Sequence, residues 1–304
     1  MLKYKILKNK IKSNFIIFLI FNFLTYLKTI YIYRFILRKN IRKKIIKKKK
    51  LLEILLQKKK RKKSGICHII GSGNSIIHSR HKINITNDFI MGCNLAALMD
   101  LKFDFYSVEF ASINKEYEPK YTVRNIVKRK LIKENTVIIF KNLSSNKLDL
   151  NFLNSFVGIT NFILDYSWRC FNKMQLKYYI HNYLLKKNKE IFYQYNSTLI
   201  LLISIAYELN FKKIVIHGLD FGGKYFFSNQ KSIYKNKHLI HKNELSVYEN
   251  ININKKGNYQ KHKALNMQRM FKLISDSLIQ NKVTLYSGTK NSASSKFLKI
   301  FEQI

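Results

Sequence analysis

Apolar residues beyond position 64 fall into short runs that alternate with longer amphipathic stretches. Five or six apolar residues bounded by turn formers are typical of buried strands, whereas apolar positions three or four apart indicate helices. Strands that alternate with helices favour an α/β domain, so we expect a mostly parallel, Rossmann-like sheet flanked by helices. The pattern predicts strands at 66–70, 88–92, 104–109, 136–140, 212–217 and 282–287, and helices at 94–101, 171–187, 198–209, 262–280 and 292–302.

The stretch 222–260 interrupts this alternation, because it has few apolar anchors and is rich in Gly, Asn, Lys and Tyr. Loops of this length inside a compact domain are usually functional. We therefore predict a lid-like loop between the strand at 212–217 and the helix at 262–280.

The first 63 residues have a different pattern. Phe15–Leu27 is thirteen residues without a charge, and after Lys28 the apolar run continues to Tyr33. About 20 apolar residues are needed to span a bilayer, so the run is marginal for a spanning helix. Arg38–Lys63 places Ile and Leu between Lys/Arg runs, which is typical of a basic amphipathic helix on an anionic membrane. We predict a basic, membrane-associating segment at 1–63 and a separate domain at 64–304.

Charge supports this division. The chain has 57 Lys/Arg, 17 Asp/Glu and a net charge of +40; residues 1–63 hold 22 Lys/Arg and one acid, Glu53, so they contribute +21. Such a segment suits an anionic membrane or a nucleic acid, since both carry phosphates. We favour the membrane and expect no nucleic-acid partner, because an apolar run adjoins the charges and no nucleic-acid motif is visible. If Phe15–Tyr33 spans the membrane, the positive-inside rule places residues 38–304 on the cytoplasmic side of the inner membrane.

Cysteines and acidic residues limit the chemistry. Cys67, Cys93 and Cys170 are scattered without a Cys-x-x-Cys pair, which argues against disulfides and structural zinc. The seven Asp residues include no Asp-x-Asp pair, the arrangement with which many nucleotide-sugar transferases hold a divalent ion. We expect no metal and no cofactor.

The best candidate for chemistry is the segment Ile66–Ser75, ICHIIGSGNS, where a predicted strand runs into a loop of small residues. Gly71 and Gly73 allow backbone conformations closed to other residues and a close approach to a ligand. Ser72, Asn74 and Ser75 add short polar side chains. The loop is neither a dinucleotide fingerprint, which needs a third Gly, nor a P-loop, which needs Gly-Lys-Ser/Thr.

Two further predicted strands end in small or polar residues. One strand ends in Gly92-Cys93-Asn94, and the strand at 212–217 runs into Gly218-Leu219-Asp220-Phe221. Ligands of open α/β sheets bind at the carboxyl ends of strands, so these ends can face one ligand. We interpret Asp220 itself as a structural residue that bonds to backbone, and His68 and His217 as core or strand-end groups.

The ordered set GSGNS, NDFIMGCN, a Ser/Thr helix start and FKKIVIHGLDF resembles the bacterial sialyltransferases of glycosyltransferase family 42, over roughly residues 65–300. Their pattern is a GxGPS loop, an NDF…RCN segment, a Ser-Gly helix start and a G(I/L)DF strand end. Asn74 stands at the family's proline, Tyr195 at an Arg, and Gly222 or Gly223 at one of two tyrosines. A related flagellin-glycosylation and pterin-kinase-like family shares GxGPS and GxDF.

The resemblance implies that 64–304 is a nucleotide-sugar-binding, glycosyltransferase-like domain with a GT-A-like fold. It implies inverting, metal-independent transfer of a sialic-acid-like sugar from a CMP-sugar to a surface glycan such as lipooligosaccharide. It implies His262 as general base, with His241 as second choice, and Tyr225 as the group that bonds the departing phosphate. The residues predicted to bind the nucleotide are Gly71, Ser72, Gly73, Asn74, Ser75, Asn94, Ser197, Thr198 and Gly218. Two alternatives remain: an enzyme of the flagellin-glycosylation or pterin-kinase-like branch, and a non-enzymatic basic protein that binds membrane or nucleic acid.

Overall fold

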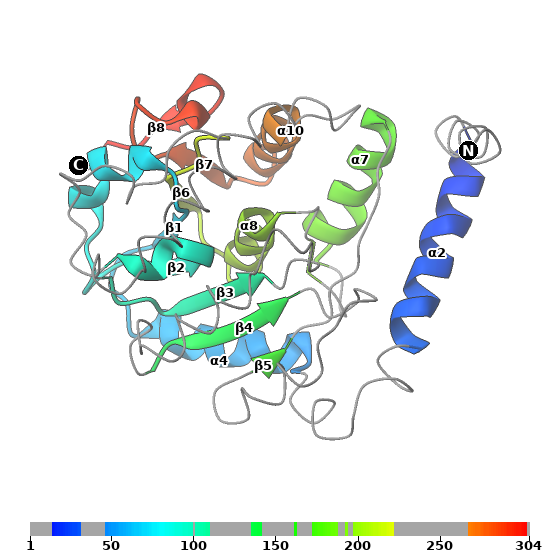
Figure 1. Ribbon diagram of the computed structural model, residues 1–304, viewed down its shortest axis with the longest axis horizontal. Coiled ribbons are helices and arrows are strands. Elements are labelled where there is room, and N and C mark those ends of the chain that lie inside the picture. Colours follow the sequence, from blue (N-terminus) through cyan, green and yellow to red (C-terminus); the bar gives the residue numbers. More distant parts are fainter. Residues whose placement is uncertain are drawn as a thin grey trace, which may run out of the picture.

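The computed structural model describes residues 14–31, 46–99, 101–109, 135–141, 161–162, 172–187, 192–193, 197–221 and 267–302. Its centre is an eight-stranded sheet in which every strand pairing is parallel (Figure 1). This confirms the predicted α/β domain with a mostly parallel sheet. The strands are β1 (Ile66–Ile70), β2 (Phe89–Cys93), β3 (Phe105–Glu109), β4 (Val137–Lys141), β5 (Asn161–Phe162), β6 (Lys213–His217), β7 (Thr284–Ser287) and β8 (Lys299–Ile300).

The order of the strands reverses at β1. The sheet runs β5-β4-β3-β2-β1-β6-β7-β8, so the chain builds one half outwards from β1 and then returns to pair β6 with the other side of β1. Residues 66–70 of β1 pair in register with 213–217 of β6. A reversal of this kind leaves a crevice outside the carboxyl ends of the two central strands, where open α/β sheets bind ligands.

The two faces of the sheet have different coverings. Alternate residues of the strands, such as Cys67 and Ile69 of β1, join one hydrophobic cluster with helix residues, because successive strand side chains point to opposite faces. His68 and Ile70 point to the other face, where the ring of Phe301 lies edge-on to His68. The α-helices are α2 (Phe15–Tyr31), α4 (Lys48–Lys60), α7 (Lys173–Tyr179), α8 (Thr198–Glu208) and α10 (Met267–Ile279); the π-helix η5 (Ile180–Leu185) continues α7.

Some predicted helices are wrong. Residues 292–302 form the 3-10 turn η8 (Ala293–Lys296) and then β8, because the Ser292 side chain caps the turn and the Phe301 amide bonds to the Ser287 carbonyl. Residues 94–101 form the 3-10 turn η4 (Asn94–Leu98), in which the Tyr106 hydroxyl accepts from the Ala97 amide. Two more 3-10 turns follow β1: η2 (Asn74–His78) and η3 (Arg80–Lys82).

The predicted N-terminal helix is present as α2, which packs beside α7 (Figure 1). The rings of Phe15 and Tyr178 lie 5.3 Å apart and those of Phe18 and Tyr179 lie 5.4 Å apart, both edge to face. Phe18 is completely buried. None of the described helices is long and apolar enough to cross a membrane.

Helix α4 lies in the core, although the sequence predicted a lipid-facing helix there. Leu51 and Leu55 are fully buried in the same cluster as the sheet. Lys48 forms a buried ion pair of 2.6 Å with Glu208 at the end of α8, and Lys59 donates to the Leu209 carbonyl at 2.6 Å. Packing therefore continues across the predicted boundary at residue 63, and that boundary stays a prediction.

Candidate functional site

The loops after β1 and β6 are bonded to one another through their backbones. The Gly71 amide donates to the His217 carbonyl at 2.9 Å, and the Gly73 amide donates to the Gly218 carbonyl at 3.0 Å. Gly218 has φ +66°, a left-handed conformation that suits glycine. The two loops thus continue the β1–β6 pairing past the strand ends, at the reversal of strand order.

Close packing of these loops accounts for their glycines. A Cβ on Gly71 would lie 2.7 Å from the Gly218 carbonyl oxygen, and a Cβ on Gly73 would lie 2.5 Å from Asp220 Oδ2. The sequence suggested that Gly71 and Gly73 let the backbone approach a ligand. In the structure, the space a side chain would fill is taken by the neighbouring loop.

Asp220 fastens the second loop to the first, as its interpretation as a structural residue predicted. Its Oδ2 accepts from the Ser75 amide at 2.9 Å, and its Oδ1 accepts from the Ser75 hydroxyl at 2.5 Å. The Ser292 hydroxyl lies 3.2 Å from the same Oδ1 and 2.9 Å from the Leu219 carbonyl. Both donors of Ser75 are therefore engaged within the protein.

Asn74 is the residue of the first loop whose side-chain oxygen lacks a hydrogen-bond donor among the described residues. Its side-chain oxygen is buried and has no hydrogen-bond partner in the described structure. A buried acceptor without a donor costs about 1–3 kcal/mol. A ligand hydroxyl or amino group at this position would supply the missing donor.

The other described members of the predicted set lie at the same edge of the sheet. Asn94 directly follows β2, which pairs with β1 through Ile70 and Gly92 at the strand ends. Ser197 is the N-cap of α8, a helix that packs under β1, β2 and β3 and leads into the amino end of β6. The first turn of α8, with Thr198, therefore faces the carboxyl edge, and no side-chain hydrogen bond from Ser197 caps it. That these residues bind a nucleotide stays a prediction.

The residues predicted for catalysis, His262 and Tyr225, lie outside the described residues, as do His241, Tyr195 and the lid-like loop. Among the described residues, no group of three or more His, Cys, Asp or Glu is arranged to hold a metal ion.

A polar network lies behind the loops. The interpretation of His68 and His217 as core or strand-end groups is confirmed by their complete burial, but their polar partners were missed. The His68 Nε2 lies 3.0 Å from Asp88 Oδ2, and the His217 Nδ1 lies 2.8 Å from the Ser79 hydroxyl. Burial lowers the pKa of His217 well below its usual value, and the neighbouring His68 lowers it further. Burial would raise the pKa of Asp88, but hydrogen bonds from His68 and Ser64 lower it overall. The sequence signal for this network is the presence of polar residues, His68 and His217, inside apolar strands.

The serine-rich stretch after β7 was also missed. Ser287, Ser292 and Ser294 are buried, and the Ser294 hydroxyl lies 2.8 Å from Ser287 Oγ and 2.9 Å from Ser292 Oγ. Through Ser292 this cluster supports Asp220. Small polar residues at a strand end, the signal used for Gly71–Ser75, are equally visible here in the sequence.

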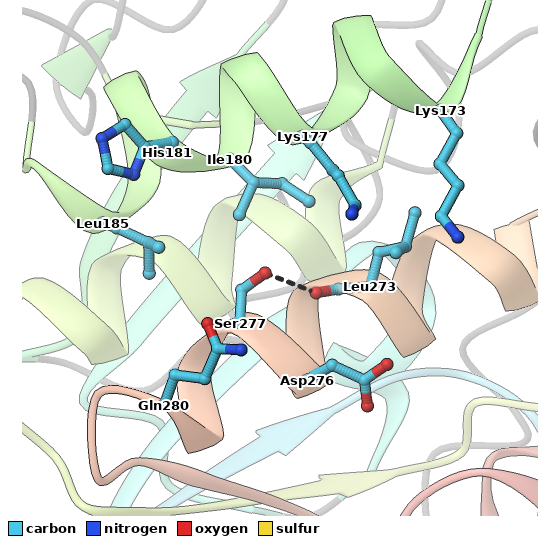
Figure 2. A pocket seen from close by; sticks show the side chains of 9 residues that line it. All are labelled: Lys173, Lys177, Ile180, His181, Leu185, Leu273, Asp276, Ser277 and Gln280. Atoms are coloured by element: carbon cyan, nitrogen blue, oxygen red, sulfur yellow. Dashed lines mark hydrogen bonds between the residues drawn. The ribbon is translucent and has the colours of Figure 1, made fainter.

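A hollow of about 370 Å³ lies elsewhere, between the helix pair α7–η5 and α10 (Figure 2). Lys173, Lys177 and His181 border it on one side, and Asp276 and Ser277 on the other. None of the residues predicted to bind the nucleotide lines it. It therefore serves as a reference surface for experiments on the strand-end site.

No family model and no curated protein matches the chain. Among solved structures, the chain is similar to the sialyltransferase CstII from Campylobacter jejuni in complex with a substrate analogue, CMP-3FNeuAc, at 18% identity and a TM-score of 0.44, over 78% of this chain and 89% of that one. It is similar to the monofunctional alpha-2,3-sialyltransferase Cst-I from Campylobacter jejuni at 15% identity and a TM-score of 0.42, over 78% and 80%. These identities and TM-scores are low, so the function is argued from this chain's own residues.

Proposed function

We propose that the protein is a metal-independent, inverting glycosyltransferase that transfers a sialic-acid-like sugar from a CMP-sugar to a surface glycan of the lipooligosaccharide type. One observation carries the proposal: the small-residue loops after β1 and β6 are bonded together where the strand order reverses, with Asn94 and the start of α8 on the same edge. The resemblance of these ordered motifs to glycosyltransferase family 42 adds the choice of CMP.

Binding is assigned to the groups that the loops leave available. The amides of Gly71 and Gly73 and both donors of Ser75 are engaged, so Ser72 and Asn74 are the members of the first loop that contact the nucleotide. The Asn74 side-chain oxygen accepts from a cytidine hydroxyl or amino group. The first turn of α8 favours the phosphate, because the amides and the dipole at the N-terminus of a helix attract negative charge.

The reaction itself is assigned to His262 and Tyr225. His262 takes the proton of the acceptor hydroxyl, and the attacking oxygen displaces CMP in line, which inverts the sugar carbon. Tyr225 donates a hydrogen bond to the phosphate as negative charge builds on it. Metal independence is argued from the absence of an Asp-x-Asp pair in the sequence. A lipid-linked acceptor is consistent with a location on the cytoplasmic side of the inner membrane.

Thermal-shift measurements with CMP, UMP, GMP and ATP test the nucleotide. CMP should raise the melting temperature of the full-length protein, and a chelator should not reverse the shift. Asn74→Ala and Asn94→Ala should reduce it, whereas Lys177→Ala, in the hollow between α7 and α10, should leave it unchanged. A shift with a purine nucleotide and none with CMP would reject the sialyltransferase assignment.

Hydrolysis of CMP-sialic acid, followed by transfer to an acceptor, tests the reaction. His262→Ala should reduce transfer by roughly 10²–10⁴-fold, the usual contribution of a general base, while CMP still binds. Tyr225→Phe should cost less, because it removes one hydrogen bond. If His241→Ala abolishes transfer and His262→Ala does not, the base is His241.

A further inference from the structure

Helix α2 presents two apolar faces, and only one is covered by the domain. Phe15, Phe18 and Asn22 lie on the covered face, where Phe18 and Asn22 are almost inaccessible to solvent. The Asn22 side chain donates back to the Phe18 carbonyl at 2.9 Å, while its buried side-chain oxygen has no hydrogen-bond partner in the described structure.

The second face is a stripe of large apolar side chains open to solvent. With 3.6 residues per turn, positions 16, 20, 23, 24 and 27 fall on one side of the helix. The exposed fractions are 67% for Ile16, 53% for Ile20, 59% for Phe23, 57% for Leu24 and 43% for Leu27. We call these five residues the α2 stripe. A contiguous apolar patch of this kind marks a contact with a membrane or a protein.

Charge next to the stripe selects between those partners. The sequence from 1 to 13 holds five Lys, and the sequence from 32 to 45 holds six Lys or Arg, with no acidic residue in either part. A second copy of the chain would bring the same eleven positive charges to the contact and be repelled. An anionic lipid surface attracts them, while its headgroup–acyl boundary accepts the apolar side chains.

We propose that the α2 stripe lies in the interfacial zone of an anionic bilayer, parallel to its surface, and holds the protein there without crossing the membrane. The covered face of α2 favours the orientation parallel to the membrane surface, because a helix that spanned the membrane would lose its contacts with Tyr178 and Tyr179. The helix has 17 residues, about 25 Å at 1.5 Å per residue, against a hydrocarbon core of about 30 Å. This proposal does not rest on the proposed transferase activity.

Flotation of the full-length protein with vesicles tests the proposal. Vesicles of phosphatidylcholine and phosphatidylglycerol should bind the protein, and vesicles of phosphatidylcholine alone should bind it more weakly. The variant Ile20→Asn/Phe23→Asn/Leu27→Asn should lower the partition coefficient by more than about tenfold, since each lost apolar side chain weakens insertion. The matched control Ile279→Asn/Ile300→Asn, which changes apolar residues that are 50% and 42% exposed elsewhere, should bind as the unmodified protein does.

A fluorescence measurement avoids destabilising changes. In a Trp168→Phe background, a tryptophan introduced by Phe23→Trp should shift its emission to the blue and be quenched by brominated lipid, whereas one introduced by Met174→Trp should not. Retention of the protein in membranes during alkaline carbonate extraction would overturn the interfacial orientation. Equal flotation of the stripe variant and the control, or loss of a dimer in the stripe variant with flotation unchanged, would overturn the membrane as the partner of the stripe.

Discussion

His217 Nε2 lies 2.8 Å from His68 Nδ1, and both imidazoles are completely buried. With one proton on each ring, a single direction satisfies the contacts: the Ser79 hydroxyl donates to His217, His217 donates to His68, and His68 donates to the Asp88 carboxylate. The network joins the amino end of β2 to the loop after β1. It thereby links the candidate site to the far edge of the sheet.

Acidification should weaken the fold through His217. Its pKa is lowered in the folded state, first by burial, so the unfolded chain binds a proton near pH 6.5 that the folded chain does not accept. The contribution of His217 to the unfolding free energy is complete above about pH 6.5. Below that pH, this single group lowers the unfolding free energy by at most about 1.4 kcal/mol per pH unit. Urea unfolding at pH 7.5, 6.5 and 5.5 measures this.

A matched pair of variants isolates that contribution. His217→Gln should flatten the dependence between pH 6.5 and 5.5, while His181→Gln, at an exposed position, should retain it. Identical pH profiles for His217→Gln and the unmodified protein would show that another group dominates.

Asp88 adds a separate loss of stability at lower pH. Its lowered pKa stabilises the fold above about pH 3.8, and that gain disappears as the carboxylate is protonated.

Gly73→Ala should disturb the junction of the two loops. Its Cβ would lie 2.5 Å from Asp220 Oδ2 and 2.7 Å from the Gly218 carbonyl oxygen, so the Ser75–Asp220 contacts must shift. We expect a loss of about 1–3 kcal/mol in unfolding free energy, the usual cost of overpacking. Gly65→Ala is the matched control, because no atom lies within 4 Å of its added Cβ. Equal unfolding midpoints in urea for the two variants would contradict the importance of this junction.

The central strands and the candidate edge could be predicted from the sequence, because buried parallel strands are short apolar runs. The ends of the sheet could not. β8 is the dipeptide Lys299–Ile300, and the Ser292–Ser294 cluster stabilises a turn where helix periodicity suggested a helix. Local patterns also could not show that Asp220 reaches Ser75, a partner 145 residues away.

The role of α4 was misread for a similar reason. Its Lys-rich sequence resembles a membrane-surface helix, yet Leu51 and Leu55 turn inward and Lys48 meets a carboxylate 160 residues later in the chain. The hydrophobic periodicity was correct, but it cannot distinguish a protein core from a lipid surface, since both are apolar.

Truncation should therefore succeed before α4 and fail after it. Removal of residues 1–45 takes away the fully buried side chain of Phe18 and should leave a cooperatively folded protein, whereas removal of 1–63 also takes away Leu51 and Leu55 beneath the sheet. As a point test, Leu55→Ala should cost about 2–5 kcal/mol, and Leu56→Ala, at a position 37% exposed, should cost much less. Circular dichroism and urea unfolding report both. A cooperative transition for the protein lacking 1–63 would contradict this assignment of α4 to the core.

The Lys48–Glu208 pair offers the last test. Burial raises the pKa of Glu208 to about 7, against the opposing effect of Lys48, and burial lowers the pKa of Lys48. The Lys48 ammonium also lies 4.6 Å from the centre of the Phe192 ring. Lys48→Met removes the charge that faces Glu208. We expect the unfolding free energy to fall by about 3–5 kcal/mol, the usual cost of leaving one partner of a buried ion pair alone.

The double variant Lys48→Met/Glu208→Leu should recover most of that loss, because apolar residues of similar volume often replace a buried ion pair without cost. The single variant Lys48→Met should also gain stability as the pH is lowered, since burial already raises the pKa of Glu208 and loss of Lys48 raises it further, so that the protonated carboxyl is the form that folds more easily. Lys272→Met, which removes an exposed partner 3.9 Å from Asp276, should change the unfolding free energy by less than about 1 kcal/mol. If the double variant is no more stable than Lys48→Met, the pair itself, and not the burial of a lone carboxylate, holds α4 against α8.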